Sequence, residues 1–249
     1  MKTVRVWVHL IFSACMLVLC AYGGYSLAVM PARAKAARAE VEEMLRENQR
    51  KAEEKQREIE EQKKKEEAER KAELDKDKNI AFLPASELNV VGIGDSVMLA
   101  ALPQLYEEFP NGYFDAVFGR TIYEGINALK KLEAEDKLGD VLVFSLGANC
   151  YIKDEDVEEL IAHSGGRPTF WLSTYGVTND SNEVTKRVIA KYDNAYYIDW
   201  ESLALPNKAK WILPDALHPN AEGSKAYAEL IDKTITKELI RNELRKILK

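Results

Sequence analysis

Ser96 stands where a predicted strand gives way to a predicted helix, in the stretch Leu88–Leu99 that reads LNVVGIGDSVML. Residues 88–93 are apolar and rich in β-branched side chains, a pattern typical of a strand buried in a parallel sheet. Gly94 permits a sharp turn, after which apolar residues recur at helical spacing. Unpaired backbone N–H groups at such a turn favour an anion, and the oxyanion of acyl transfer is one. Capping of the helix by Asp95 and Ser96 is the alternative interpretation.

The segment DALHPN at residues 215–220, just before the last predicted helix, offers a histidine base for such chemistry. A separation of three residues lets Asp215 reach the Nδ1–H of His218, which leaves Nε2 free to take a proton. The alternative is a capping box with an incidental histidine. His163 is the only other histidine outside the apolar N-terminal segment, and its HSGGRP context predicts a helix that ends in a glycine turn. A histidine base is therefore expected at position 218.

Two further segments follow predicted strands and offer donors for an oxyanion. Asn149 carries a side-chain amide, and Gly147 nearby allows close approach to a ligand. Gly119 follows the second predicted strand, at residues 113–118, and offers a backbone N–H to the same hole, with Arg120 beside it. A turn asparagine and an arginine paired with an acid are the alternative interpretations.

In their order and spacing these four segments resemble the blocks of the SGNH (GDSL-like) hydrolase superfamily. The matching residues are Gly94-Asp95-Ser96, Gly119, Gly147-x-Asn149 and Asp215-x-x-His218. The resemblance covers about residues 88–235 and implies Ser96 as nucleophile, His218 as base and Asp215 as the residue that orients the base. It also implies an oxyanion hole made by the N–H groups of Ser96 and Gly119 and the side chain of Asn149. Many members carry Asp where this chain has Cys150, and we expect this departure to change local structure rather than the acyl chemistry.

The segments IGDSVML, DAVFGR, SLGANC and DALHPNAEG are similar, more narrowly, to the extracytoplasmic domain of peptidoglycan O-acetyltransferases of the acyltransferase-3/SGNH type. This resemblance implies a serine that takes an acetyl group and passes it to a muramoyl hydroxyl of the cell-wall glycan. In that family the domain is usually fused to a multi-span acyltransferase, so a separate membrane partner is expected to deliver acetyl to this chain. The resemblance also places the domain on the extracytoplasmic side.

Contacts to the substrate are expected from side chains close to these segments, namely Asp95, Arg120, Tyr151 and Tyr175. Trp200 and Trp211 also lie in predicted loops or at strand ends, where aromatic rings can stack on sugar rings. Packing in the core or at its rim is the alternative for each aromatic side chain.

Strands and helices alternate from residue 80 onward. Short apolar strands are expected at residues 90–93, 113–118, 141–146, 168–173 and 195–199, with helices between them and a long helix after Pro219. This alternation predicts an α/β fold with a five-stranded parallel sheet between two layers of helices, a flavodoxin-like three-layer α/β/α arrangement. The carboxyl ends of parallel strands share one edge, where ligands bind. The candidate residues fall at or just beyond that edge.

The charge of the chain argues against nucleic acid as a partner. The net charge is −6, and residues 80–249 carry 18 basic against 26 acidic residues, whereas phosphate binding needs a basic face. Two histidines and one cysteine outside the apolar N-terminal segment give no zinc pattern. We therefore expect no metal and no cofactor.

The N-terminal residues 1–30 predict a membrane anchor. Val6–Met30 is a nearly continuous apolar run of 25 residues, preceded by Lys2 and Arg5. At about 1.5 Å per residue it can cross a bilayer core of roughly 30 Å. A cleavable signal peptide has a shorter apolar region of about 7–15 residues. We therefore expect a retained single-pass anchor with the domain outside, and cleavage is the alternative.

Residues 31–79 are predicted to form a charged spacer before the domain at 80–249. Residues 40–78 are almost entirely Glu, Lys, Arg, Gln and Ala, and Glu precedes a base by four residues in seven pairs, which favours a helix. A 4-3 spacing typical of a coiled coil holds only if two polar positions are admitted; the positions are Val41, Leu45, Asn48, Ala52, Lys55 and Ile59. The alternative is a disordered charged linker.

Three functions are compatible with these observations. The leading hypothesis is a membrane-anchored serine O-acetyltransferase, or acetylesterase, that acts on cell-wall glycan. A non-catalytic wall-binding scaffold with a retained fold is the second, and the complete set of Ser, Asp, His, Gly and Asn argues against it. The third is a lipase or thioesterase of the same superfamily, which would prefer longer acyl chains.

Overall fold

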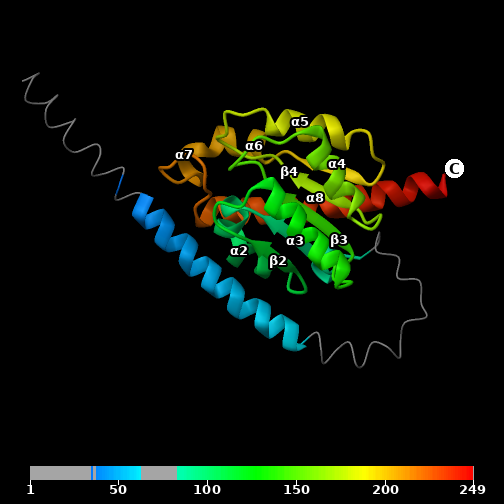
Figure 1. The fold of residues 1–249 in the computed structure, drawn as a ribbon, viewed down its shortest axis with the longest axis horizontal. Coiled ribbons are helices and arrows are strands. Elements are labelled where there is room, and N and C mark those ends of the chain that lie inside the picture. Colours follow the sequence, from blue (N-terminus) through cyan, green and yellow to red (C-terminus); the bar gives the residue numbers. More distant parts are fainter. Residues whose placement is uncertain (1–34, 36–37, 63–82, 249) are drawn as a thin grey trace, which may run out of the picture. The chain divides into compact units, whose positions relative to one another are not determined.

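The computed structural model describes residues 35, 38–62 and 83–248 (Figure 1). The chain divides into two units, residues 1–43 and residues 44–249. The anchor predicted at residues 1–30 lies outside the described residues. Among those that are described, no helix combines the length and the hydrophobicity needed to cross a membrane.

The elements after residue 83 alternate between strand and helix. In chain order they are η2 (Ala85–Glu87), β1 (Val90–Gly94), α2 (Ser96–Glu108), β2 (Tyr113–Ala116), α3 (Ile122–Ala134), β3 (Val141–Ser145), α4 (Asp154–Ala162), β4 (Thr169–Leu172), α5 (Ser181–Ile189), β5 (Ala195–Ile198), α6 (Trp200–Ala204), η3 (Leu205–Asn207), α7 (Lys208–Trp211) and α8 (Ala221–Ile247). The five predicted strands are all present, each within two residues of its expected bounds.

All five strands run parallel, in the order β2-β1-β3-β4-β5. The predicted α/β fold with a five-stranded parallel sheet is thus confirmed. β1 lies inside the sheet, and its last residue, Gly94, pairs with Ala116 of β2 and with Ser145 of β3. This register brings the carboxyl ends of the three strands level. The segments that follow them therefore begin at one edge of the sheet.

Helices cover both faces of the sheet (Figure 1). α2 and α8 pack against each other on one face, and α3, α4 and α5 lie in sequence on the other. Alternate residues of β1 serve the two cores, and Val91 and Ile93 join the apolar cluster beneath α3–α5. Gly92 faces the α2 side, where a Cβ would overlap the ring of Phe114 and crowd Met98. Close packing of α2 on the sheet therefore depends on a glycine at this position.

The segment from residue 200 to residue 211 folds into three short helices that the sequence pattern did not predict. Trp200 is fully buried, with its ring stacked on Trp211 at 6.2 Å between centroids and edge-on to Tyr227 at 5.2 Å. Of the two interpretations of Trp200, packing in the core is the one that holds, because its ring is enclosed by other side chains. These short helices carry the chain from the end of β5 back toward the start of α8.

Residues 38–62 are helical. From residue 44 onward the helix belongs to the same compact unit as the sheet, and Leu45, Ala52 and Ile59 are buried. Here the structure differs from the expected free spacer, because three apolar side chains are removed from water.

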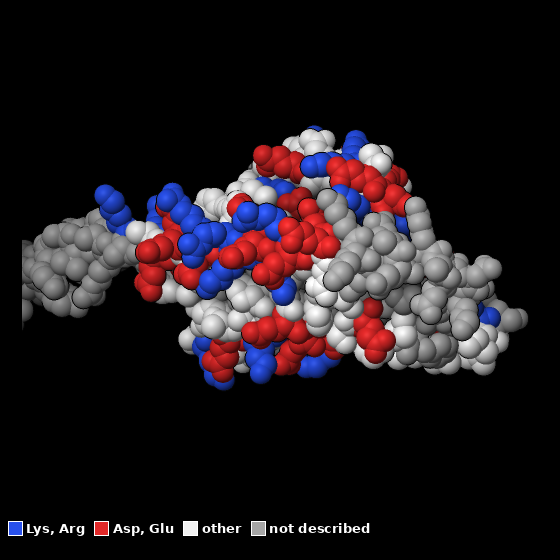
Figure 2. Space-filling model, turned by 90° about the horizontal axis from the view of Figure 1, so that it is seen from below, with Lys and Arg blue, Asp and Glu red and all other residues white. Residues whose placement is uncertain are grey.

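Basic and acidic side chains alternate over the described residues of the face shown in Figure 2, which leaves no continuous basic surface on that face.

We predict that Gly92→Ala lowers the free energy of unfolding by about 1–3 kcal/mol, because the added methyl group overpacks the site against Phe114. Chemical denaturation followed by circular dichroism measures this loss. Combining Gly92→Ala with Phe114→Leu should cost less than the sum of the two single changes, since the smaller side chain makes room. Strict additivity of the two losses would contradict the packing argument.

Candidate active site

Ser96 is the first residue of α2 and follows β1 after a single residue. Asp95 between them is the N-cap, and its Oδ1 accepts a hydrogen bond of 2.9 Å from the N–H of Val97. A Cβ at position 94 would overlap the side chain of Met98, so the turn needs glycine for close approach. This tight turn points the Ser96 hydroxyl out of the carboxyl edge of the sheet, with the positive end of the α2 dipole behind it.

The structure brings Ser96, His218 and Asp215 into one hydrogen-bonded relay. His218 Nε2 lies 2.8 Å from Ser96 Oγ, and His218 Nδ1 lies 2.6 Å from Asp215 Oδ2. The histidine is 122 residues from the serine in sequence, so only the fold unites them. With Nδ1 donating to the carboxylate, Nε2 is free to accept the serine proton, which is the arrangement of a serine nucleophile and its base.

The turn from Asp215 to His218 is built by its own backbone. Asp215 Oδ1 accepts hydrogen bonds from the N–H groups of Leu217, at 3.0 Å, and His218, at 3.1 Å. Ala216 adopts a φ of 62°, and its carbonyl packs so closely on Gly176 that a Cβ there would overlap it. The loop after β4 thus packs against the turn and supports the position of the Asp215 carboxylate beside the imidazole of His218.

The Asp215 carboxylate is stabilised in its charged form. Burial opposes ionisation, but hydrogen bonds from His218 and from two backbone N–H groups outweigh it and lower the pKa of Asp215 below its ordinary value. The carboxylate is therefore ionised throughout the neutral pH range. A negative charge at this position stabilises the protonated form of a neighbouring imidazole.

The segments after β2 and β3 meet beside Ser96. The side-chain amide of Asn149 donates to the carbonyl of Arg120 at 3.1 Å, and the Sγ of Cys150 accepts a hydrogen bond of 3.3 Å from the N–H of Ile122. Gly119, with a φ of 73°, lies exposed in the loop that these contacts hold. An amide NH₂ carries two donors, so Asn149 can hold Arg120 with one and face an oxyanion with the other.

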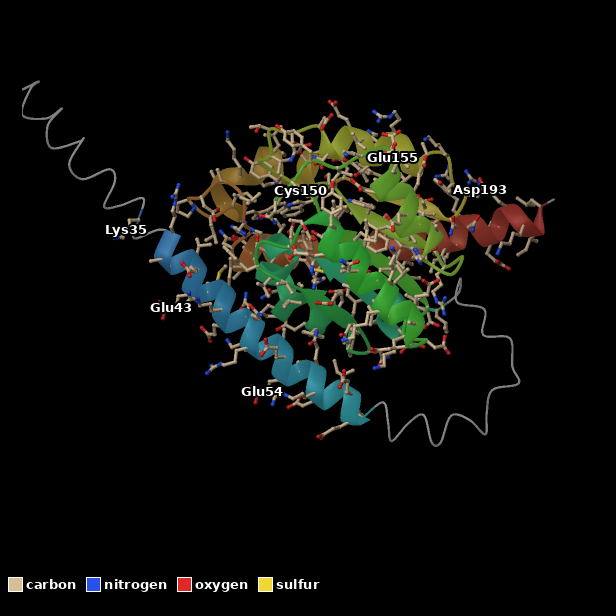
Figure 3. The ribbon with its side chains drawn as sticks, viewed as in Figure 1. Lys35, Glu43, Glu54, Cys150, Glu155 and Asp193 are labelled. Atoms are coloured by element: carbon tan, nitrogen blue, oxygen red, sulfur yellow. The ribbon has the colours of Figure 1, made fainter. Side chains whose placement is uncertain are left out.

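Cys150, labelled in Figure 3, serves the local structure as expected. Its sulfur accepts from the first N–H of α3 and so ties the segment after β3 to the start of that helix. Burial raises the pKa of the thiol, which keeps it protonated at neutral pH. A neutral thiol is a poor nucleophile, so Cys150 does not compete with Ser96.

Asp95 and Arg120 do not face a substrate, which corrects the expectation from the sequence. Asp95 is fully buried, and its Oδ2 accepts a hydrogen bond of 3.3 Å from the N–H of Ala148. Arg120 is 8% exposed and binds both the carboxylate and the carbonyl of Asp115, as well as the carbonyl of Gly94. Both side chains are therefore used to hold the loops of the site together.

Exposed aromatic side chains flank the same loops. Tyr151 is 74% exposed, and Phe118 and Tyr123, which the sequence analysis did not single out, are 55% and 52% exposed. Tyr175 is half-buried beside Gly176, next to the Asp215 turn. Phe118 and Tyr123 flank the Gly119–Arg120 segment in the sequence. Their nearness to that segment is the signal that could have identified them as candidate substrate contacts.

Comparison with known proteins agrees with this geometry, although no family model matches the chain. It is 24% identical over 165 residues to the peptidoglycan O-acetyltransferase OatA of Listeria monocytogenes and 28% identical over 148 residues to the O-acetyltransferase OatA of Staphylococcus aureus. The two matches cover 66% and 57% of this chain. They cover 26% and 24% of the relatives, so the chain spans about a quarter of their length.

The fold matches the solved C-terminal catalytic domain of the Streptococcus pneumoniae peptidoglycan O-acetyltransferase A, which carries a methylsulfonyl adduct. The TM-score is 0.52 at 20% identity, over 62% of this chain and 94% of that domain. The fold of this chain is therefore that of an SGNH-type catalytic domain. Ser96, Gly119 and Asn149 follow three neighbouring strands at the carboxyl edge of the sheet, and His218 reaches Ser96 there.

We predict that stability depends on pH through Asp95. Burial raises the pKa of Asp95 from the ordinary 3.8 to about 6, against the opposing effect of its hydrogen bonds to Val97 and Ala148. The folded chain therefore binds this proton more tightly than the unfolded chain, and stability falls as pH rises from about 4 to about 6. The expected loss is about 3 kcal/mol, measured by denaturation at several pH values.

Asp95→Asn should remove this loss from the stability profile. Asp199→Asn is the matched control, because Asp199 also caps a helix but is exposed, and this variant should keep the wild-type slope. Identical slopes in wild type and Asp95→Asn would contradict the prediction.

Proposed function

We propose that this chain is a serine acyltransferase that moves acetyl groups onto, or off, hydroxyls of cell-wall glycan through an acyl-Ser96 intermediate. The observation that carries the proposal is the continuous relay from Asp215 through His218 to Ser96, with hydrogen bonds of 2.6 and 2.8 Å. The identity of the acyl group, acetyl, and of the acceptor, peptidoglycan, is taken from the names of the sequence relatives.

The first half of the reaction makes the acyl-enzyme. His218 Nε2 takes the proton of the Ser96 hydroxyl as Oγ attacks the acetyl carbonyl carbon, and the carbonyl oxygen becomes an oxyanion. The tetrahedral intermediate collapses, the C–O bond to the leaving alcohol breaks, and that alcohol takes the proton from His218. Acetyl remains on Ser96 as an ester.

The second half returns the enzyme to its starting state. A sugar hydroxyl in the place of the departed alcohol gives its proton to His218 and attacks the acetyl carbon. The bond to Ser96 Oγ breaks, and His218 returns the proton to the serine. Water in the same place gives acetate instead, so transfer and hydrolysis differ only in which hydroxyl reaches the acyl-enzyme.

Stabilisation of the two oxyanions is assigned to the N–H groups of Ser96 and Gly119 and the side chain of Asn149. Ser96 begins α2, so its N–H has no carbonyl partner within the helix. The contact between Asn149 and the Arg120 carbonyl supports this assignment, because it brings the side-chain amide next to Gly119. Donors fixed before the reaction lower the barrier most, since they need no reorganisation.

The setting of the enzyme completes the proposal. We place the domain on the extracytoplasmic side of the cell membrane, with residues 1–30 as a single-pass anchor, because a cell-wall glycan lies there. A multi-span membrane acyltransferase is the partner that we expect to supply acetyl to Ser96. The apolar run Val6–Met30 and the resemblance described above support these two expectations.

A single-turnover experiment tests the proposed chemistry. The purified full chain is mixed with an acetyl ester, with and without a glycan that contains muramic acid, and acetyl-Ser96 is followed by mass spectrometry. We expect acetylation at Ser96 and faster loss of the label in the presence of glycan. Ser96→Ala and His218→Ala should lower the rate by at least about 10³-fold, because each removes the nucleophile or its base.

The control is Ser86→Ala, which changes a serine outside the relay and should keep the wild-type rate. Release of acetate at one rate regardless of glycan would identify an esterase. Rapid reaction only with longer acyl esters would identify a lipase or thioesterase. A wild-type chain that never acquires acetyl would instead favour a wall-binding scaffold.

We also predict that Tyr151→Ala raises the KM for the glycan acceptor about fivefold, because an exposed ring beside the oxyanion loops can stack on a sugar ring at about 1 kcal/mol. Hydrolysis of a small acetyl ester should be unchanged, since that reaction needs no sugar contact. Leu244→Ala is the control. Leu244 is also exposed, but it lies about 35 Å along α8 from its start near His218. Equal KM values in wild type and Tyr151→Ala would contradict the prediction.

A further inference from the structure

The helix at residues 44–62, which we call the strap, has one buried face. Leu45, Asn48, Ala52 and Ile59 are between 1% and 8% exposed, and they recur at spacings of three, four and seven residues. Asn48 is polar, and a buried amide must find hydrogen-bond partners or destabilise the fold. Its partners lie in the helix that carries the nucleophile.

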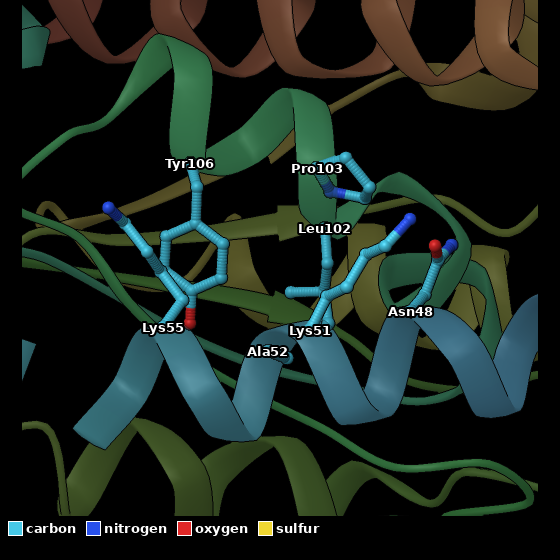
Figure 4. A pocket seen from close by; sticks show the side chains of 7 residues that line it. All are labelled: Asn48, Lys51, Ala52, Lys55, Leu102, Pro103 and Tyr106. Carbon is cyan, nitrogen blue, oxygen red and sulfur yellow. The ribbon is translucent and has the colours of Figure 1, made fainter. Parts of the chain in front are cut away.

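Pro103 interrupts the hydrogen-bond ladder of α2. A proline has no N–H, so the carbonyl of Leu99, four residues earlier, has no donor within its own helix. Asn48 Nδ2 lies 3.4 Å from this carbonyl oxygen and 3.2 Å from that of Ala100. Figure 4 shows Asn48 and Pro103 on the two facing helices. The strap thus supplies the donor that proline removes, one turn after Ser96.

The same turn of α2 also contacts α8, through the Ala100 carbonyl that Asn48 binds. Ser224 Oγ donates to the carbonyl of Ala100 at 3.3 Å, and Ser224 lies in the first turn of α8, six residues after His218. Asn48 of the strap and Ser224 of α8, the helix that follows His218, therefore both donate hydrogen bonds to one turn of α2. The distance between Ser96 Oγ and His218 Nε2 depends on how these helices are held.

A second anchor lies two turns further along the strap. Gln56 Nε2 donates to the carbonyl of Phe114 at 2.7 Å, in the edge strand β2. β2 leads directly into the loop that carries Gly119. The strap therefore contacts both the helix of the nucleophile and the strand that precedes the proposed oxyanion loop.

Apolar packing alone does not fix the strap in place. A pocket of about 180 Å³ lies between it and α2 (Figure 4), lined by Asn48, Lys51, Ala52, Lys55, Leu102, Pro103 and Tyr106. Side chains around such a space make fewer contacts than those in a filled core. The amide contacts of Asn48, which lines the pocket, and of Gln56 therefore set the register of the strap on the domain.

We propose that Asn48 is a positioning residue for Ser96, and that the strap belongs to the catalytic unit. By bonding the carbonyl that Pro103 leaves open, Asn48 holds the first turns of α2 at the distance from His218 that proton transfer requires. The inference rests on the proposed function, because it concerns the same nucleophile. Ser96 reactivity toward a sulfonylating reagent tests it separately from acetyl transfer.

The experiment compares Asn48→Leu with wild type in the full chain. Leucine keeps the branched shape and the number of heavy atoms of asparagine and removes both donors. Ser96 is treated with methanesulfonyl fluoride, and mass spectrometry gives the maximal rate of modification and the half-saturating concentration separately. We expect the maximal rate to fall about tenfold and the half-saturating concentration to stay within about twofold. Glu54→Leu, on the outward side of the strap (Figure 3), should match wild type.

A rescue separates positioning from simple attachment of the strap. Pro103→Ala restores an N–H at position 103, which can donate to the Leu99 carbonyl from within α2. In the Pro103→Ala background, Asn48→Leu should change the modification rate by less than about twofold. In the wild-type background we expect the same substitution to lower the rate about tenfold. The Pro103→Ala background also provides the comparison if Asn48→Leu alone fails to fold, because α2 then no longer needs the strap donor.

Two results would overturn the proposal: a wild-type modification rate in Asn48→Leu, or a tenfold loss that persists with Pro103→Ala. Failure of the proposed function has a different signature. In that case Ser96 of the wild type takes the sulfonyl group but never acetyl, and the comparison of strap variants remains valid.

Discussion

The buried carboxylate of Asp95 is the interaction on which the site depends. One oxygen caps α2 through Val97, and the other accepts from Ala148 in the segment after β3. A single side chain thus fixes the direction of the helix that begins with Ser96 and the distance to the segment that carries Asn149. Burial makes this arrangement costly in the charged form, which is why the pKa of Asp95 is raised to about 6. The two hydrogen bonds that Asp95 accepts offset part of this cost, and they hold the start of α2 next to the segment after β3.

Most of the fold and the relay could be predicted from the sequence, because both leave local signals. A parallel strand buried on both faces is a short apolar run, and the Asp215-x-x-His218 spacing lets the carboxylate reach the imidazole. The sequence suggests Asp95 and Arg120 as substrate contacts, because residue type alone does not reveal that both side chains are buried. For Trp200 the sequence left stacking on a sugar and packing in the core both open, since its partners Trp211 and Tyr227 come from other segments of the chain.

The choice between transfer and hydrolysis depends on the surroundings of the relay rather than on the relay itself. In the proposed mechanism the same proton transfers through His218 serve a sugar hydroxyl and water. The exposed rings of Phe118, Tyr123 and Tyr151 lie in or beside the two segments that meet next to the nucleophile, joined there by the contacts of Asn149 and Cys150. Rings in this position can hold a sugar over the acyl-enzyme and exclude water from it, which favours transfer.

The strap shows why periodicity underestimates some contacts. Its apolar residues are too few to predict packing on a domain, since the contacts that set its register come from the amides of Asn48 and Gln56 to backbone carbonyls. The matching signal was Pro103, a proline inside a predicted helix that leaves a carbonyl without a donor. A buried asparagine in one helix and a proline in another are each unfavourable alone. Together they satisfy one another, so removal of residues 44–62 would take away a structural part of the α/β domain rather than a spacer.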